Sequence, residues 1–245
     1  MRPVFVDCHS HVCPSGDDGV ATVAEGAVLC REAAKRGTGI LYATPHVWPH
    51  LPLTPAREEQ VRRDFAELVP QAGLDVRLGF ELTPTRPLLH DELRRYALDG
   101  TDCVLIEVPF AGSAALLWAL AEEAERQGLR PVVAHPERTE VVLSDERLAD
   151  ELGERFPLQV NATSLLGRHG PTAEAIGWRL LEEGRAALVA SDGHRLARPP
   201  FLDDAYDLAV NRLGGEAAAR FFDGSALGPI SEAPPAPSRE ARRGA

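Results

Sequence analysis

The side chains in this sequence that are best suited to chemistry are His, Asp and Glu residues that follow short apolar runs. Six of seven such runs are followed within a few residues by His9 with His11, His46, Glu81, Glu107, His135, or Asp192 with His194. Imidazole and carboxylate groups are standard ligands of Mn, Fe and Zn, which they bind in their neutral or deprotonated forms. These residue types therefore predict a metal site.

The spacing within two of these groups favours the sharing of one ion. Residues two apart in an extended segment place their side chains on the same side, as His9 and His11 would. Asp192 and His194 have the same offset, and Asp18 adds a loop carboxylate beside the first pair.

A single His at the end of a strand is more often a hydrogen-bonded structural residue than a ligand, so the prediction depends on the whole set. Glu107 is the member that is hardest to explain structurally, because it interrupts an apolar run, where an unpaired carboxylate would be costly. Three other histidines, His50, His90 and His169, lie outside the pattern and are predicted to be surface or structural residues.

The apolar runs alternate with helical stretches, a pattern typical of parallel strands with crossover helices. The runs are Val4–Val6, Ile40–Ala43, Val76–Leu78, Cys103–Ile106, Val132–Ala134, Leu158–Val160 and Ala187–Ala190. Helices are predicted at 22–36, from 54 onwards, and near 113–127, 145–155, 172–184 and 202–213. In parallel α/β barrels the carboxyl ends of all strands lie on one face, so the polar residues would converge there.

Two of the helix starts have recognisable caps. Thr22 and Glu25 form a capping-box pattern at the first helix, and Gly37 follows its end. Thr54 precedes Pro55 at a first helical position, where the missing N–H of proline costs nothing.

The composition is that of a globular protein and disfavours several kinds of partner. The 245 residues are 44% hydrophobic and 26% charged, with a formal net charge of −11. Arg side chains are scattered rather than gathered into a basic stripe, so nucleic-acid binding is not expected. No signal peptide or membrane-spanning apolar run is present, so we expect a cytoplasmic protein that does not insert into membranes.

The domain organisation follows from the same patterns. We predict a single domain over residues 1–227 and a disordered tail over 228–245, a segment rich in Pro, Ala, Ser and charge. The four cysteines lack CxxC spacing and are predicted to be buried free thiols. They are Cys8, Cys13, Cys30 and Cys103.

Four short motifs resemble those of the polymerase-and-histidinol-phosphatase (PHP) superfamily. They are His9-Ser10-His11, Thr44-Pro45-His46, Ala134-His135-Pro136-Glu137-Arg138 and Ser191-Asp192-Gly193-His194. Within this superfamily the chain is most similar to the manganese-dependent protein-tyrosine phosphatases of bacterial capsule and exopolysaccharide operons. The segments that carry this closer similarity are Asp17-Asp18-Gly19, 105–110, 159–167 and Arg198-Pro199-Pro200-Phe201.

The resemblance implies a distorted (β/α)7 TIM-like barrel of the PHP type that holds three divalent ions, Mn²⁺ or alternatively Fe or Zn. The ligands that it implies are His9, His11, Asp18, His46, Glu81, Glu107, His135, Asp192 and His194. It further implies that Arg138 and Arg198 contact the phosphate, which a planar guanidinium can bind through two hydrogen bonds. Two segments depart from the family pattern, 80–84 and Val47-Trp48-Pro49-His50, and both are expected to contact the substrate.

The function that the resemblance implies is removal of phosphate from phosphotyrosine in proteins, with a bacterial tyrosine kinase of polysaccharide synthesis as the expected partner. Adjacent divalent ions would hold the phosphate and lower the pKa of a water, and the resulting hydroxide would attack phosphorus directly. Two alternatives stay open: a small-molecule phosphatase that acts on histidinol phosphate or nucleotides, and a non-catalytic metal-bound module that binds a kinase.

A cysteine-dependent mechanism is not expected, although Cys30 and Arg36 have the Cys-x5-Arg spacing of another class of tyrosine phosphatase. The residues between them contain no Gly and indicate a continuous helix. A phosphate-binding loop needs backbone amides that point inward, and a continuing helix uses those amides for its own hydrogen bonds.

Overall fold

Parallel strands and helices alternate along the chain in the computed structural model, which describes residues 2–231. The strands are β1 (Phe5–Ser10), β2 (Thr38–Ala43), β3 (His46–Val47), β4 (Asp75–Leu78), β5 (Glu81–Leu82), β6 (Cys103–Glu107), β7 (Arg130–Ala134), β8 (Leu158–Asn161) and β9 (Ala186–Ala190). All seven predicted runs overlap one of these strands, so the predicted α/β class is confirmed. The two strands that were not predicted, β3 and β5, have two residues each.

The strands form two parallel sheets rather than a single one, with the orders β1-β2-β4 and β3-β5-β6-β7-β8-β9. Two interrupted segments connect the sheets, because β3 follows β2 after two residues and β5 follows β4 after two residues. A parallel bridge between Ser10 and Gly193 joins the end of β1 to the segment after β9. The carboxyl end of β1 therefore lies between those of β2 and β9.

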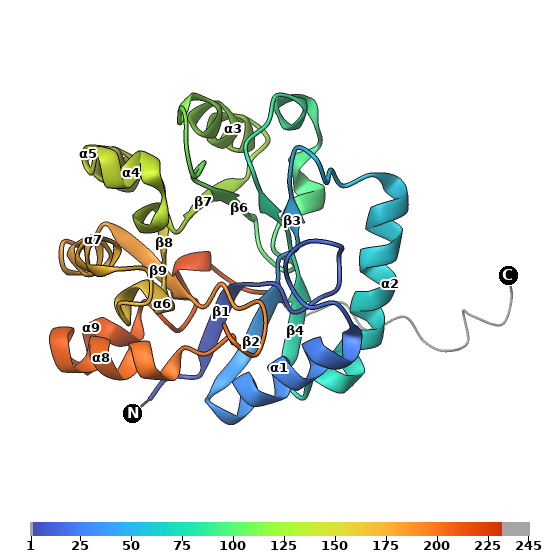
Figure 1. Cartoon of the computed structure of the whole chain (residues 1–245), viewed down its shortest axis with the longest axis horizontal. Coiled ribbons are helices and arrows are strands. Elements are labelled where there is room, and N and C mark those ends of the chain that lie inside the picture. The colour runs from blue at the N-terminus through green and yellow to red at the C-terminus, as the bar shows by residue number, and fades with distance from the viewer. Residues whose placement is uncertain (1, 232–245) are drawn as a thin grey trace, which may run out of the picture.

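Helices surround the strands (Figure 1). They are α1 (Val23–Lys35), α2 (Pro55–Ala72), α3 (Ala115–Arg126), α4 (Glu140–Ser144), α5 (Arg147–Arg155), α6 (Ala162–Leu165), α7 (Pro171–Glu182), α8 (Asp203–Leu213) and α9 (Gly215–Ala219). Short 3-10 helices are η1 (Pro87–His90), η2 (Leu93–Tyr96), η3 (Pro136–Arg138) and η4 (Ser225–Leu227). The six predicted helices are present, whereas α4, α6 and α9, of four or five residues, are too short to show a helical period.

Both predicted helix caps are present. The hydroxyl of Thr22 accepts a hydrogen bond from the amide of Glu25 at 3.2 Å, and the hydroxyl of Thr54 accepts one from the amide of Arg57 at 3.3 Å. The Glu25 carboxylate accepts from the amide of Ala21, at 2.9 Å, rather than from that of Thr22 as in an ideal capping box. Such caps typically stabilise a helix by about 1 kcal/mol.

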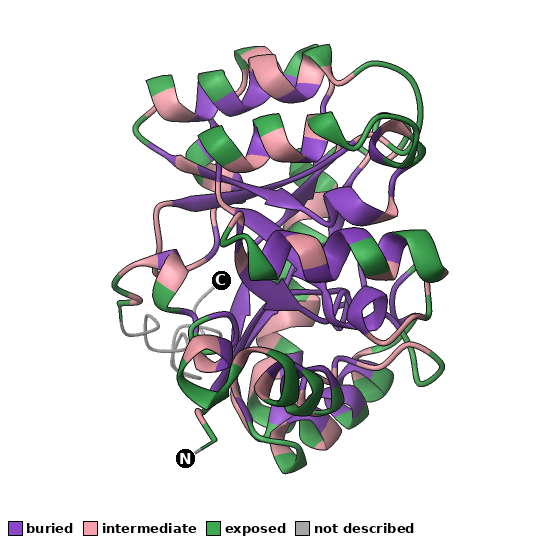
Figure 2. Cartoon of the chain, turned by 90° about the vertical axis from the view of Figure 1, so that its left-hand side faces the viewer, coloured by how far each residue is buried: buried purple, intermediate pink, exposed green. Residues whose placement is uncertain are grey.

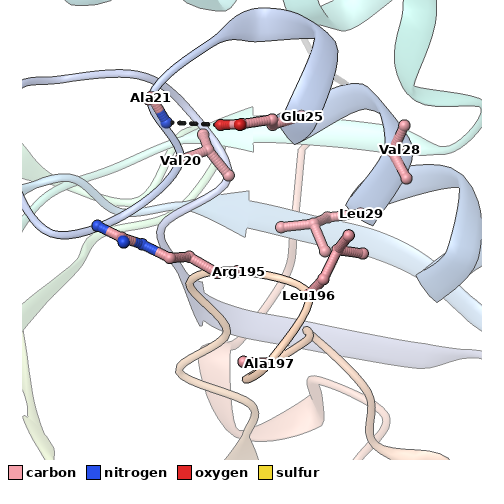
Figure 3. A pocket seen from close by; sticks show the side chains of 8 residues that line it. All are labelled: Val20, Ala21, Glu25, Val28, Leu29, Arg195, Leu196 and Ala197. Atoms are coloured by element: carbon pink, nitrogen blue, oxygen red, sulfur yellow. Dashed lines mark hydrogen bonds between the residues drawn. The ribbon is translucent and has the colours of Figure 1, made fainter.

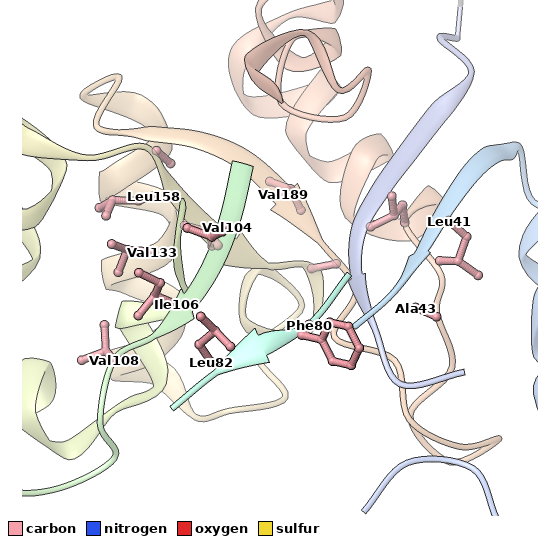
Figure 4. Packing of buried hydrophobic residues seen from close by; sticks show 14 of the residues in the cluster. Leu41, Ala43, Phe80, Leu82, Val104, Ile106, Val108, Val133, Leu158 and Val189 are labelled. Carbon is pink, nitrogen blue, oxygen red and sulfur yellow. The ribbon is translucent and has the colours of Figure 1, made fainter. Parts of the chain in front are cut away.

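The strands are buried, and the helices expose only their outer sides (Figure 2). Val104 and Ile106 pack in the larger apolar cluster, in which Leu82, Val133 and Val189 also lie (Figure 4). The alternate residues of β6 pack in a second cluster instead. That cluster contains Cys103 and Leu105 of β6 together with apolar residues of β1, β2, β7 and β9: Val6, Cys8, Tyr42, Val132, Ala134, Leu188 and Ala190. Strands of both sheets therefore share one interior, and the carboxyl ends that carry the polar residues are held rigidly next to one another.

The remaining predictions about the chain have mixed outcomes. All four cysteines are buried and free, as predicted. Of the predicted tail at 228–245, the structure describes 228–231, where the amide of Ser231 donates to the carbonyl of Gly100 at 3.0 Å and Arg77 donates to the carbonyl of Ser231 at 2.6 Å. Residues 232–245 lie outside the described residues. Among residues 2–231, no helix is long and apolar enough to cross a membrane.

Candidate metal centre

The carboxyl ends of the strands bring all nine predicted ligands together. Their donor atoms form four overlapping groups, and within each group these atoms lie within 4.8 Å of one another. The groups are His11, Asp18, His46 and His194; His9, Glu81 and His135; His9, His11 and Asp192; and His46, Glu81 and Glu107.

Glu81 occupies the centre of this cluster. The register of β3 and β5 pairs His46 directly with Glu81. Oε2 of Glu81 lies 3.0 Å from Nε2 of His9, 3.2 Å from Nε2 of His11 and 3.0 Å from Nδ1 of His46. Oε1 lies 2.9 Å from Nε2 of His135. One fully buried carboxylate is thus shared by four imidazoles.

The contacts of Glu81 Oε2 do not have hydrogen-bond geometry. Within the described part of the chain this buried oxygen has no hydrogen-bond partner, and neither has Nδ1 of His46. An unsatisfied buried polar atom is rare and costly in native proteins. Nitrogen and oxygen donor atoms that converge on one place are what a divalent cation requires, so the donor set fits such ions.

His9 and His11 lie on the same side of the chain, as their spacing predicts. They belong to or directly follow β1, and their Nε2 atoms are 3.2 Å apart. The amide of His11 donates to the carbonyl of Gly193 at 2.7 Å, and the amide of Asp192 donates to the carbonyl of His9 at 2.9 Å. These two backbone hydrogen bonds hold the pair His9 and His11 next to the pair Asp192 and His194.

Two of the nine residues have strained backbones. His135 has φ 35° and Asp192 has φ 50°, in the left-handed region that residues other than Gly rarely adopt. Between Asp192 and His194, a Cβ on Gly193 would lie 2.5 Å from backbone atoms of Pro200, so only Gly fits there. Strain of this kind costs about 1–3 kcal/mol per residue and persists where the surroundings hold it in place, often at functional sites.

The carboxylates Asp18 and Glu107 complete the cluster at its outer side. Oδ1 of Asp18 lies 3.2 Å from Nε2 of His194 and 3.5 Å from Nε2 of His46. Glu107 accepts a hydrogen bond from the hydroxyl of Thr83. Burial, and to a lesser extent the nearby Glu81, raise the pKa of Glu107 to about 7.

The electrostatics of the cluster favour bound positive charge. Burial acts against the ionisation of Glu81, but His9 and His46 outweigh it and hold the pKa of Glu81 well below its usual range. Burial would likewise lower the pKa of His46, yet Glu81 and Asp18 raise it to about 9. Divalent ions that enter the cluster would exchange with the protons on these imidazoles.

Several residues that support the ligands were not predicted from the sequence. His9 Nδ1 lies 2.9 Å from Oε1 of Gln159, whose amide nitrogen donates to Oδ1 of Asn161 at 2.8 Å. Asn161 in turn donates to Oδ2 of Asp192 at 2.9 Å. Gln159 and Asn161 belong to β8, the one apolar run that no His, Asp or Glu follows closely. The sequence feature that could have indicated this role is the presence of two amide side chains at alternate positions of a short, mainly apolar run.

The Gln159 chain of hydrogen bonds leads to a testable prediction. Partners of this kind orient metal-binding imidazoles, and their loss typically weakens metal affinity by 10- to 100-fold. We expect Gln159→Leu to weaken Mn²⁺ affinity by about 10- to 100-fold, as measured by calorimetric titration of metal-free protein. Thr38→Val is the matched control, since Thr38 is also buried and its hydroxyl has no hydrogen-bond partner within residues 2–231. Unchanged affinity in Gln159→Leu would contradict this role.

Asp17 is a second supporting residue whose role was not predicted. Its Oδ2 accepts a hydrogen bond from the amide of His46 at 3.0 Å and lies 3.6 Å from Nδ1 of His11. Asp17 thus anchors the backbone of His46 and lies beside the ring of His11, whereas its neighbour Asp18 faces the cluster directly.

Arg138 and Arg198 both reach the cluster. Arg138 pairs with Oδ2 of Asp192, and Nη2 of Arg198 lies 3.4 Å from Oδ1 of the same carboxylate. Nε of Arg198 is buried without a hydrogen-bond partner in the described chain. Both guanidiniums line a pocket of about 180 Å³ together with Asp18, His46, Trp48, Glu107, Phe110, His135, Asp192 and His194. Two cations beside the donor cluster are placed to bind an anion there.

A larger, mainly apolar hollow of about 370 Å³ lies beside this pocket, between α1 and the loop at 195–197 (Figure 3). It is lined by Val20, Ala21, Glu25, Val28, Leu29, Arg195, Leu196 and Ala197. This lining contains no member of the ligand cluster, so the smaller polar pocket is the candidate site.

The residues outside the predicted cluster behave as expected. Cys30 is buried within α1, which continues to Lys35, so the Cys-x5-Arg spacing does not form a phosphate loop. His169 is hydrogen-bonded to the hydroxyl of Thr163 at 2.9 Å, and His50 stacks on Trp48 with ring centroids 5.1 Å apart.

Comparison with known proteins identifies the family. Residues 5–226 match the family model described as "Capsular polysaccharide synthesis, CpsB/CapC". The chain belongs to the CpsB/CapC family. This match confirms the resemblance that the motifs predict. It covers the predicted ligands and both arginines.

Relatives that resemble this chain carry phosphatase names. The chain is 30% identical to tyrosine-protein phosphatase YwqE of Bacillus subtilis over 201 residues. This aligned stretch covers 78% of this chain and 78% of YwqE. It is 29% identical over 233 residues to tyrosine-protein phosphatase CpsB of Streptococcus agalactiae serotype V, with 89% of this chain and 95% of that protein covered.

A solved structure agrees with this family assignment. The fold matches a chain from the crystal structures of YwqE from Bacillus subtilis and CpsB from Streptococcus pneumoniae, described as unique metal-dependent tyrosine phosphatases. The TM-score is 0.75 at 27% sequence identity, over 87% of this chain and 90% of that chain.

Proposed function

We propose that this CpsB/CapC family member is a metal-dependent protein-tyrosine phosphatase that hydrolyses the phosphomonoester of phosphotyrosine. The observation that carries the proposal is the convergence of nine metal-ligand side chains and two arginines on one pocket. The names of its relatives and the description of the matching structure support the choice of reaction and substrate.

We assign metal binding to all nine residues of the cluster, with three divalent ions shared among its overlapping groups. Mn²⁺ is the proposed metal, and Fe and Zn suit the same nitrogen and oxygen donors. Bound ions would supply Lewis acidity, which neutralises phosphate charge and lowers the pKa of the attacking water. Glu81 would hold adjacent ions together, since its two oxygens face different imidazoles.

Arg138 and Arg198 are assigned to the phosphate. Both approach Asp192, whose carboxylate therefore holds them beside the cluster. A guanidinium can turn two parallel N–H groups toward phosphate oxygens, which positions the ester and stabilises negative charge that develops during hydrolysis. The amide of His194 donates to the carbonyl of Arg198 at 2.8 Å, so one tight loop positions both a metal ligand and a phosphate ligand.

The proposed protein substrate is a bacterial tyrosine kinase of polysaccharide synthesis, with the reaction taking place in the cytoplasm. The capsular polysaccharide synthesis description of the family supports this process. Dephosphorylation would then return the kinase to its unphosphorylated form.

A substrate panel tests the proposed function. We expect chelator-treated protein to regain hydrolysis of a phosphotyrosine peptide on addition of Mn²⁺, and to cleave that peptide faster than histidinol phosphate or nucleotides. Cys30→Ser should be as active as the parent, because Cys30 is buried in a helix away from the cluster. Activity that survives chelation but disappears in Cys30→Ser would contradict the proposal. Metal-loaded protein that cleaves no phosphoester would instead indicate a binding module.

A further inference from the structure

Two aromatic side chains border the metal pocket, and the proposed chemistry gives neither of them a role. Trp48 follows β3, and Phe110 follows β6, so they reach the pocket from different parts of the chain. The ring of Trp48 stacks on that of His46, with centroids 4.2 Å apart and planes inclined by 25°. The ring of Phe110 lies 6.4 Å from that of His135 and 5.8 Å from the guanidinium carbon of Arg138.

The two rings stand beside different parts of the cluster. His46 stacks on Trp48, and its Nδ1 lies 3.0 Å from Oε2 of Glu81. His135, which lies near Phe110, approaches Oε1 of the same carboxylate. One aromatic ring of the pocket lining therefore lies beside each of these two imidazoles.

Local contacts hold both aromatic residues in place. Trp48 stacks on His46 and on His50, and the amide of Leu51 donates to its carbonyl at 3.0 Å. The carbonyl of Phe110 accepts a hydrogen bond from the amide of Glu140 at 2.9 Å. Phe110 is nevertheless 51% exposed. A large apolar ring that is exposed and lines a polar pocket is suited to a ligand that covers it.

The chemistry of the pocket specifies such a ligand. Two guanidiniums and the metal-ligand cluster line it and suit a phosphate, and two aromatic rings line it and suit an apolar group. An aryl phosphomonoester combines the same two chemical characters, because its dianionic phosphate is joined directly to a flat apolar ring. Aromatic rings attract one another in stacked or edge-to-face arrangements beyond simple burial. An alkyl phosphate has no ring to place against these aromatic side chains.

We propose that Trp48 and Phe110 bind the phenyl ring of phosphotyrosine and so make the site selective for aryl over alkyl phosphomonoesters. This inference rests on the proposed phosphatase function and adds to it the residues that determine substrate class. Trp48 lies in the segment 47–50, which was expected from the sequence to contact the substrate, and the ring contact would give that segment a function.

The test is the ratio of kcat/KM for a phosphotyrosine peptide to kcat/KM for the same peptide with phosphoserine, measured with Mn²⁺-loaded protein. We expect Trp48→Ala and Phe110→Leu each to lower this ratio by about 10-fold, and Trp48→Phe and Phe110→Tyr to retain it. Leu208→Ala, on α8 and 41% exposed, is the control and should leave the ratio unchanged. A ratio that stays within about twofold of the parent in both Trp48→Ala and Phe110→Leu would overturn the inference.

A binding measurement separates failure of this inference from failure of the proposed function. If the parent protein cleaves no phosphotyrosine peptide, the function is wrong, and the ring contact is tested by calorimetry with phenylphosphonate and methylphosphonate. We expect the parent to bind phenylphosphonate about 10-fold more tightly and both truncated variants to lose that preference. Equal affinity of the parent for the two phosphonates would overturn the ring contact by itself.

Discussion

Replacement of Glu81 by Gln is expected to lower kcat/KM for phosphotyrosine hydrolysis by about 10²- to 10⁴-fold. The substitution keeps the shape of the side chain but removes the charge that four imidazoles and the proposed ions share. Loss of one partner from a buried charged set typically costs about 3–5 kcal/mol. Because each 1.36 kcal/mol is a factor of about ten, this cost corresponds to the expected range.

The measurement combines steady-state kinetics with elemental analysis of the purified variant, which should retain fewer ions than the parent. Glu123→Gln is the matched control, because Glu123 is also a buried glutamate but lies on α3, where Gln127 donates to it at 2.7 Å. We expect this control to keep its metal and its activity. Full activity and full metal content in Glu81→Gln would rule out a central role for Glu81.

Replacement of Arg138 by Ala is expected to lower kcat/KM by about 10- to 100-fold while the bound ions are retained. A hydrogen bond to a charged group typically contributes about 1.5–3 kcal/mol, and Arg138 is assigned to the phosphate rather than to the metal. Arg138→Lys should recover only part of the loss, since an ammonium group cannot offer two parallel N–H groups.

Kinetics and metal analysis of the same preparations check this second prediction. Arg147→Ala is a suitable control because Arg147 forms an exposed ion pair with Asp145, a kind of pair that contributes little. The control should match the parent in both measurements. If Arg138→Ala lost its ions, Arg138 would instead have a structural role through its pair with Asp192.

The convergence of His46, Glu81 and Asp192 could be predicted because it depends only on general rules. Parallel strands connected by helices place their carboxyl ends together, whatever the details of packing. Short apolar runs locate those ends to within a few residues, which is sufficient to group polar side chains that are far apart in the sequence. The buried position of Glu107 was predictable for a different reason, the cost of an unpaired charge inside a strand.

The arrangement within the cluster could not be predicted in the same way. Glu81 became central because β4 is interrupted and resumes as β5 in register with His46, and strands of two residues leave no periodic pattern. The strained backbones of His135 and Asp192 depend on the surrounding packing, which no local pattern encodes. The role of Gln159 depends on where its side chain points: its Oε1 lies 2.9 Å from Nδ1 of His9. Residue types and their positions thus predict which side chains come together. The register of the strands decides which of them approach the same carboxylate oxygen.

The most direct test of the nine-residue metal centre is anomalous diffraction from crystals loaded with Mn²⁺, measured on both sides of the manganese absorption edge. We expect three anomalous peaks within the cluster, each bounded by His, Asp or Glu donors from the nine assigned residues and with Glu81 between adjacent peaks. Absence of anomalous density from the cluster, or manganese bound only by other residues, would contradict the proposed centre.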